Sequence, residues 1–393
     1  MDKNGQLLTF AYLVVFFIGM MFGLESIMPL FFKSLGVSII DWGILAFLFT
    51  LGMLFFEMIW GILSDKFGKS KLIVGGLLAS AIVTLAYVAP FSLYLFLGLQ
   101  VLRGVFNVMS TPSTRMLISE LSSPKNLAFA LGLWFSAMRL GSTVGSLFFS
   151  YVAQECSYAI AFGSCSTLLF IIGLIALIVL RRSEFLLRSE VGNMGKLETR
   201  GTSTRQALGE ISKASSVYAI FFCAVVGFLQ MSMIRTIVPL FASEILGAST
   251  FLVGLNQAEF TGFSVVFFLL SGLLADKIGK KTTVTIGFTA LLFSAIAFSM
   301  TTDFYQLSAS TILSSFGFSL VAPSLLALLV SSIPGKVLGA SVGIYGSIEN
   351  LGITIAPLMF TLIWSSWGLQ YVFYICGIIQ AIGIIFALTL EKT

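Results

Sequence analysis

Residues 61–69 of this chain read GILSDKFGK, and residues 272–280, which lie 211 positions further along, read GLLADKIGK. Both stretches follow the pattern Gly-x-Leu-x-Asp-Lys-x-Gly-Lys, and each lies in a short polar gap between long apolar runs. A pattern that recurs at a fixed distance is typical of a duplicated architecture. The sequence therefore predicts a chain built from two similar halves.

The composition predicts that the chain is embedded in lipid. Hydrophobic residues make up 58% of the 393 residues, charged residues make up 10%, and the mean hydropathy is +1.03. Because a soluble domain has about 25% charged residues, this chain cannot cover a water-facing surface. Runs of about 20 apolar residues are long enough to cross a bilayer as helices.

Twelve such runs predict an all-α membrane protein with twelve transmembrane helices. The predicted spans cover about residues 7–32, 40–63, 72–90, 93–119, 126–153, 157–180, 216–242, 249–274, 282–301, 304–332, 338–364 and 368–390. Lysine and arginine gather in the even-numbered gaps between spans, whereas the odd-numbered gaps hold only Lys33. By the positive-inside rule we expect both termini to be cytoplasmic.

The one long polar stretch, residues 181–215, separates six spans from six. It predicts a flexible cytoplasmic linker between an N-terminal bundle (1–180) and a C-terminal bundle (216–393). The 211-residue offset also relates Gly43 to Gly254 and Pro112 to Pro323. Because an even number of helices separates equivalent points, the halves are expected to be parallel repeats.

On these residues and this topology the chain resembles the major facilitator superfamily over essentially its full length. That family has twelve spans in two six-helix bundles and the same motif between spans 2 and 3, matched here by Gly61, Leu63, Asp65, Lys66, Gly68 and Lys69. The resemblance, which is nearest to its drug/proton antiporters, implies a secondary active transporter in the cell membrane. The expected partners are a small-molecule substrate, protons and the lipid bilayer, with no nucleic acid, and the chain is expected to be a monomer.

The residue types argue against an enzyme. The chain has no histidine, so it lacks a Ser-His dyad and a zinc-peptidase His pair, and any proton carrier must be a carboxylate. The four cysteines have no metal-like spacing, and the segment Gly68-Lys69-Ser70 lacks the first glycine of a phosphate-binding loop. We therefore predict no catalytic residues, no metal and no cofactor, with a proton gradient as the energy source.

Ionisable residues inside a span are functional candidates because burying them in lipid is costly. The proton-coupling candidates are Glu25, Arg103 and Glu57. Glu25 precedes Pro29 as an acidic residue precedes proline in span 1 of drug-efflux members, and Arg103 with Gly104 resembles the span 4 arginine motif of proton-coupled members. Alternatively, Glu25 pairs with Arg235, or Arg103 forms a structural pair with a carboxylate of its own bundle. A nearby arginine favours an ionised carboxylate whereas burial favours the protonated form, and the sequence does not decide between them.

Further polar residues on the predicted lining and walling spans are candidates for a substrate cavity. They are Arg139, Arg235, Glu259, Glu349, Asn350, Asn107 and Gln230. Hydrogen bonds between helices would explain the neutral residues Asn107, Gln230 and Asn350 equally well. Residues 141–146 lie where antiporters of this family carry a Gly-Pro-x-x-Gly-Gly signature, but here the proline is absent and close helix packing also explains Gly141 and Gly145. Efflux of drug-like compounds is the favoured function, uptake of a small organic anion or metabolite is the alternative, and a passive channel or intramembrane enzyme is remote.

The doubled motif predicts a pair of cytoplasmic gates. Their candidate residues are Gly61, Asp65, Lys66, Gly68, Lys69, Arg115, Asp276, Lys277, Gly279 and Lys280. The resemblance implies that Asp65 faces the start of span 11, where a helix N-terminus stabilises an anion, and Arg115 is a plausible second partner. The alternative is that both loops are only tight turns with topogenic lysines. We expect Asp65→Asn to fold but to impair transport.

Overall fold

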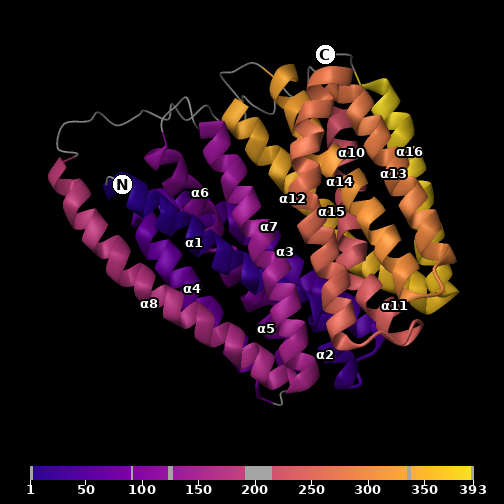
Figure 1. The fold of residues 1–393 in the computed structure, drawn as a ribbon, viewed down its shortest axis with the longest axis horizontal. Coiled ribbons are helices and arrows are strands. Elements are labelled where there is room, and N and C mark those ends of the chain that lie inside the picture. Colours follow the sequence, from indigo (N-terminus) through magenta and orange to yellow (C-terminus); the bar gives the residue numbers. More distant parts are fainter. Residues whose placement is uncertain (1–2, 90–91, 123–126, 191–214, 334–337, 391–393) are drawn as a thin grey trace. The chain divides into compact units, whose positions relative to one another are not determined.

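The computed structural model describes residues 3–89, 92–122, 127–190, 215–333 and 338–390, and these residues are helical with short turns and no strand (Figure 1). The helices of the first half are α1 (Lys3–Gly23), the 3-10 turn η1 (Leu24–Ser26), α2 (Met28–Ser34), α3 (Ile39–Phe67), α4 (Lys69–Ala86), α5 (Leu93–Asn107), α6 (Ser110–Leu121), α7 (Leu127–Glu155) and α8 (Tyr158–Glu190). Those of the second half are α10 (Ser215–Thr236), α11 (Val238–Glu244), α12 (Thr250–Ile278), α13 (Lys280–Met300), α14 (Phe304–Ser332), α15 (Leu338–Trp367) and α16 (Leu369–Thr389). The predicted linker falls largely on residues 191–214, which lie outside the described residues, so the predicted domain boundaries stay a prediction.

Eleven segments of the described chain are helices long and apolar enough to cross a membrane. The remaining predicted span, residues 126–153, is present as the 29-residue helix α7 but is not among the eleven. Its interior carries Arg139 and several serines and threonines, which lower its hydropathy. The architecture is therefore the all-α membrane protein that the sequence predicts.

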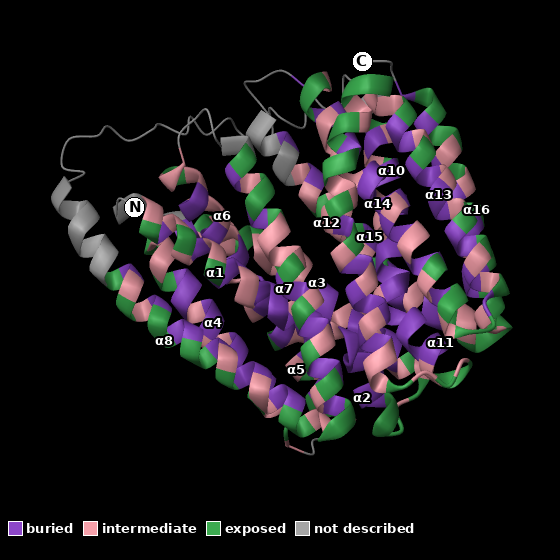
Figure 2. Ribbon diagram, in the orientation of Figure 1, coloured by how far each residue is buried: buried purple, intermediate pink, exposed green. Residues whose placement is uncertain are grey.

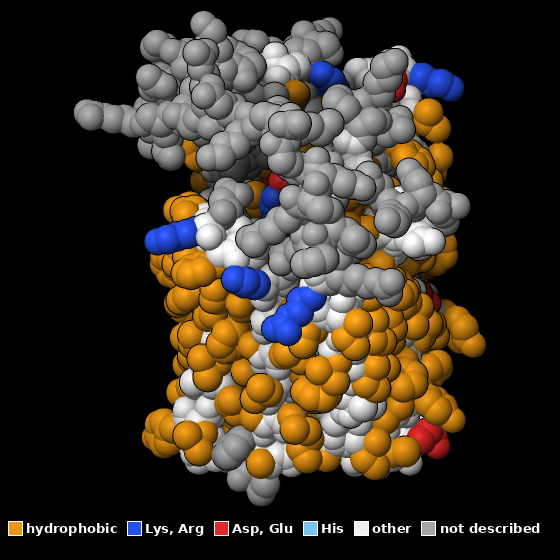
Figure 3. Space-filling model, turned by 90° about the vertical axis from the view of Figure 1, so that its left-hand side faces the viewer, with side chains coloured by type: hydrophobic (Ala, Val, Ile, Leu, Met, Phe, Trp, Pro, Cys, Tyr) orange, Lys and Arg blue, Asp and Glu red, His pale blue; other side chains and the backbone are white. Residues whose placement is uncertain are grey.

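Apolar side chains cover the outside of this fold as well as its interior. Buried residues alternate with exposed ones along most helices (Figure 2), and many exposed residues are large hydrophobics such as Phe55, Leu269 and Ile378. On the face drawn in Figure 3, hydrophobic side chains cover much of the described surface, and the lysines and arginines lie in its upper and middle parts. An apolar outer surface suits a lipid environment.

Three of the predicted spans are interrupted, which is a correction to the sequence prediction of single helices. Span 1 divides into α1, η1 and α2, and span 7 divides into α10 and α11 at Ile237. Pro29 and Pro239 lie in the first turns of α2 and α11, because proline cannot donate the backbone hydrogen bond that would continue the preceding helix. Span 4 divides into α5 and α6 just before Pro112, whereas Pro323, its counterpart in the repeat, lies inside the continuous helix α14.

The chain packs as two compact units. Unit 1 contains residues 1–37, 48–198 and 249–258, and unit 2 contains residues 38–47, 199–248 and 259–393. The segments 38–47 and 249–258 are the first turns of α3 and α12, and they are related by the 211-residue offset. Each of these two helices therefore contributes its beginning to one unit and its remainder to the other.

Candidate functional site

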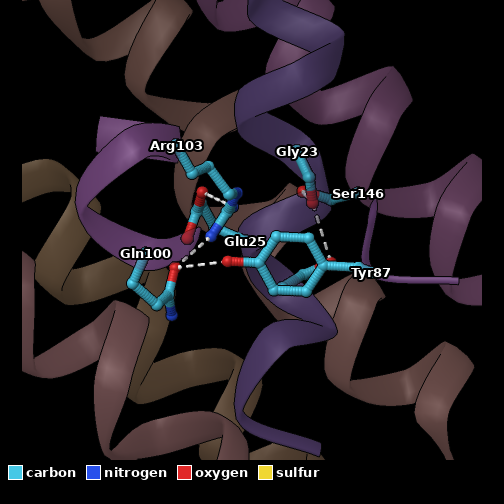
Figure 4. Close-up of polar contacts among 7 residues, drawn as sticks. Gly23, Glu25, Tyr87, Gln100, Arg103 and Ser146 are labelled. Carbon is cyan, nitrogen blue, oxygen red and sulfur yellow. Dashed lines mark hydrogen bonds and ion pairs between the residues drawn. The ribbon is translucent and has the colours of Figure 1, made fainter. Parts of the chain in front are cut away.

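The break in span 1 positions Glu25. Its backbone lies in η1, between the end of α1 and the start of α2. The carbonyl of Gly23 accepts hydrogen bonds from the hydroxyls of Ser26 (2.9 Å) and Ser146 (3.3 Å) (Figure 4). Ser146 belongs to α7, so this bond ties the broken turn to a neighbouring helix.

Glycines allow α1 and α7 to pack backbone against backbone at this turn. A Cβ atom added to Gly23 would lie 2.6 Å from the carbonyl oxygen of Ser142 and would overlap the backbone of Ser146. Gly141 and Gly145 face the backbone of α1 with equally little space. Close helix packing, one of the two explanations that the sequence allowed for Gly141 and Gly145, is thus what the structure contains. This packing fixes the place of Glu25 within unit 1.

Glu25 forms an ion pair with Arg103 of α5 through Oε1 and Nη2 (Figure 4). The arginine side chain is 2% exposed and the glutamate side chain 14% exposed. Of the three predicted proton-coupling residues, the structure brings these two together, and Glu57 lies half-buried further along α3. The arrangement is the pair within one bundle that the sequence allowed as an alternative for Arg103.

Arg103 also has neutral partners that the sequence analysis missed. Its Nη1 donates a hydrogen bond to Oε1 of Gln100 (3.1 Å), which lies one helical turn earlier on α5 and also accepts a hydrogen bond from the Tyr87 hydroxyl (3.1 Å). The guanidinium carbon lies 4.5 Å from the centre of the Phe49 ring and 5.8 Å from that of Tyr87, within cation–π range. The spacing of Gln100 and Arg103 inside an apolar run was a signal that could have identified this contact.

The position of Arg103 carries a neutral residue in unit 2. Ser314 occupies the position that corresponds to Arg103 in the repeat, and its hydroxyl accepts a hydrogen bond from Gln230 (3.0 Å). Gln230, predicted as a cavity residue, also donates to Ser294 (2.6 Å) and to the carbonyl of Leu291 (3.3 Å), so it joins α10 to α13 and α14. The two halves share a backbone architecture but carry different chemistry at this depth.

The other predicted cavity residues lie on five different helices. Arg139 on α7, Arg235 on α10, Glu259 on α12, and Glu349 with Asn350 on α15 are half-buried, whereas Asn107 is buried at the end of α5. Tyr345 lies beside Glu349, one turn away on α15. Their role in a substrate cavity stays a prediction.

The two motif loops have the same geometry. Gly68 and Gly279 have positive φ angles of 94° and 88°, which favour glycine, and each directly precedes a helix. The lysine that follows each glycine contacts the end of the fourth span of its half. Lys69 forms an ion pair with Glu120 of α6, and Lys280 donates to the Ser331 hydroxyl of α14 (3.2 Å).

Only some of the predicted gate residues have side chains that the structure describes. The side chain of Asp65 and those at the start of α15 lie outside the described residues, so their pairing stays a prediction. Arg115 lies over the ring of Trp134 at 4.6 Å, which gives this arginine an aromatic partner that the sequence analysis did not foresee. Lys66, Asp276 and Lys277 are exposed at the ends of α3 and α12, and Gly61 lies within α3 near Pro112.

Comparison with known families agrees with this architecture. The sequence profile of the Major Facilitator Superfamily matches residues 8–221 and again residues 220–393. The chain belongs to the Major Facilitator Superfamily. It is therefore a transporter with a multi-pass helical architecture, which accounts for the repeated motif and for ionisable residues at membrane depth.

Curated relatives and solved structures are similar over most of the chain. A multidrug resistance efflux pump PmrA homologue from Lactococcus lactis is 26% identical over 88% of this chain and 84% of its own length. Multidrug resistance protein 2 from Bacillus subtilis is 22% identical over 91% of this chain and 88% of its own length. The crystal structure of a bacterial homologue of the human lysosomal transporter Spinster superposes with a TM-score of 0.80 at 12% identity, covering 98% of this chain and 97% of that one.

Proposed function

We propose that this transporter is a proton-coupled antiporter that exports amphipathic, drug-like molecules by alternating access, with a single chain as the transporting unit. The observation that carries the proposal is the buried ion pair of Glu25 and Arg103 at the interrupted first span. The names of the Lactococcus and Bacillus relatives, both multidrug transporters, support the substrate class.

The chemistry of the pair suits proton exchange. A chain without histidine has carboxylates as its natural proton carriers near neutral pH. Glu25 balances the charge of Arg103 when it is ionised, and it leaves one net positive charge at this depth when it takes up a proton. A lipophilic cation entering nearby would stabilise the ionised carboxylate and so release the proton. This competition couples the movement of a cation to that of a proton in the opposite direction.

Unit 2 carries Ser314 at the position of Arg103, so the ion pair on which the proposal rests belongs to unit 1. Gln230, Ser294 and Ser314 satisfy one another by hydrogen bonds and carry no group that titrates. We further propose that the motif loops lie on the cytoplasmic side, with both termini, in the cell membrane. There Asp65 would latch the cytoplasmic face closed until the cycle opens it, which Asp65→Asn would impair.

Reconstitution in proteoliposomes tests the coupling, with radiolabelled tetraphenylphosphonium as the probe. We expect the wild type to accumulate it against its gradient when an opposing proton gradient is imposed. Glu25→Gln should lose this accumulation yet keep counterflow, the exchange of labelled for unlabelled probe without a gradient, because counterflow moves no proton. Glu155→Gln, which removes an exposed carboxylate at the end of α7, is the matched control and should behave as the wild type.

Two results would contradict the proposal. Wild-type accumulation that is independent of the proton gradient would remove proton coupling. Gradient-driven accumulation of benzoate instead of tetraphenylphosphonium would favour uptake of an organic anion, the alternative that the sequence left open.

A further inference from the structure

Gln100 contacts one guanidinium nitrogen of Arg103, Nη1, whereas Glu25 pairs with the other, Nη2. Its Oε1 accepts from both Arg103 Nη1 and the Tyr87 hydroxyl, at 3.1 Å each, so its carbonyl dipole points its negative end at the guanidinium. The donor from Tyr87 fixes that orientation, because it occupies the second acceptor site of the same oxygen. Gln100 is 1% exposed and Tyr87 is 2% exposed, so water does not compete for these bonds.

The aromatic rings complete a neutral enclosure of the arginine. The centre of the Phe49 ring lies 4.5 Å from the guanidinium carbon of Arg103. Gly104 allows this contact because it lets the backbones of α3 and α5 approach closely. The Tyr87 ring lies further off, at 5.8 Å, within a cluster that includes Phe31, Phe32 and Phe96. Rings attract the cation through their negative faces without needing an anion.

We propose that Gln100 is a positioning residue that sets the pH at which Glu25 exchanges its proton, by carrying the charge of Arg103 while Glu25 is neutral. This inference rests on the proposed function. Arginine stays protonated throughout, so each time Glu25 takes up a proton the guanidinium loses its counter-charge in a buried place. Gln100, Phe49 and Tyr87 are the groups that then remain around it.

The oxygen of Gln100 acts on Glu25 in a definite direction. Its partial negative charge stabilises Arg103 in both states but repels a second negative charge nearby, so it disfavours the ionised carboxylate of Glu25. Removing that oxygen should therefore make Glu25 harder to protonate. Replacing the amide by a carboxylate should make one of the two acidic groups easier to protonate, because two carboxylates would share one arginine.

The other groups around the pair leave this expectation intact. Tyr87, just after α4, and Cys165, on α8, are titratable side chains that interact electrostatically with both Glu25 and Arg103. Phe49 of α3, which lies against Arg103, and Ser146 of α7, which bonds the carbonyl of Gly23, do not titrate. Tyr87 and Cys165 are unchanged in both Gln100 variants, so they do not contribute to a difference between them.

The test is the pH dependence of tetraphenylphosphonium binding to the purified full-length protein, which should rise with pH as Glu25 ionises. We expect Gln100→Leu to move the midpoint about one pH unit lower, which corresponds to about 1.4 kcal/mol of lost repulsion between the amide oxygen and the ionised carboxylate. Gln100→Glu should move it about one pH unit higher. Gln380→Leu removes a buried amide of unit 2, which donates to the Val226 carbonyl at 3.2 Å, and should leave the midpoint unchanged.

Opposite shifts separate a positioning role from a structural one, since mere damage to packing would lower binding in both variants without moving the midpoint. That result would overturn the inference. Tyr87→Phe keeps the ring and removes only the hydroxyl, so it should fold even if Gln100→Leu does not. It should move the midpoint to lower pH by less than Gln100→Leu does. An unchanged midpoint in Tyr87→Phe would equally overturn the inference. If Glu25→Gln uncouples transport while the Gln100 variants leave the midpoint in place, this inference alone fails. If wild-type binding does not depend on pH, the proposed function fails with it.

Discussion

Removing Arg103 alone from the buried ion pair should destabilise the protein more than removing both partners. Arg103→Met keeps most of the side-chain length but leaves Glu25, whose side chain is only 14% exposed, without its cation. Breaking a buried pair from one side costs about 3–5 kcal/mol. The carboxyl can escape this cost by taking up a proton, at about 1.4 kcal/mol for each pH unit above the ordinary glutamate pKa of about 4.3. At pH 7 protonation of Glu25 costs about 3.7 kcal/mol. The expected loss of stability is therefore similar whether Glu25 stays ionised or takes up a proton.

The other two variants of the cycle should lose less. Glu25→Gln leaves the guanidinium on Gln100 and the Phe49 ring, so we expect a loss below about 2 kcal/mol. The double variant Glu25→Gln/Arg103→Met buries no charge and should be more stable than Arg103→Met alone. Thermal unfolding in detergent, followed by tryptophan fluorescence, gives the order of stability of the wild type, the two single variants and the double variant.

The pH dependence gives a second check on the same variants. Folded Arg103→Met holds a proton on Glu25 that the unfolded chain has released at pH 7, so its stability falls as the pH rises. The difference in stability between Arg103→Met and the wild type should therefore be smaller at pH 5 than at pH 7. A buried pair of this strength is ruled out if Arg103→Met melts at the same temperature as the wild type at pH 7, or if the loss of stability of the double variant equals the sum of the two single losses.

Three further predictions concern the glycines and the motif lysine. Gly23→Ala should abolish folded protein on size-exclusion chromatography, because the added Cβ meets the backbone of α7, whereas Gly98→Ala, with nothing within 4 Å, should elute as the wild type. Gly68→Ala should lower the melting temperature, with a cost of about 1–3 kcal/mol for a side chain at φ 94°; a wild-type melting curve would contradict that strain. Lys69→Met should change stability by less than about 1 kcal/mol, because its partner Glu120 is 62% exposed, and a larger loss in the same assay would mean that the contact is stronger than a surface pair.

The transmembrane architecture was predictable because each span is encoded locally, in a run of apolar residues long enough to cross a bilayer. The 211-residue repeat was equally accessible, since it needs only the sequence compared with itself. The interruptions of spans 1 and 7 were not predicted, although Pro29 and Pro239 stand at them. A membrane helix can absorb a proline, as Pro323 in α14 does, so proline alone does not decide between a continuous helix and a break.

The site was predictable in its members but not in its pairing. Glu25 and Arg103 stand out because charges in an apolar run are rare. Their contact depends on how α1 and α5 are rotated about their axes, which is set by contacts such as that of Gly23 with α7. Gln100 and Tyr87 escaped notice because neutral polar side chains are common in membrane helices and carry little signal until a partner is located.

The most direct test of the central claim, that Glu25 exchanges a proton for substrate, is the number of protons released when tetraphenylphosphonium binds. It can be measured by titration calorimetry of the purified protein in buffers of different ionisation enthalpy. We expect the wild type to release a proton near the midpoint pH of binding and Glu25→Gln, folded and still binding, to release none. Equal proton release from both proteins, or none from the wild type at any pH, would contradict it.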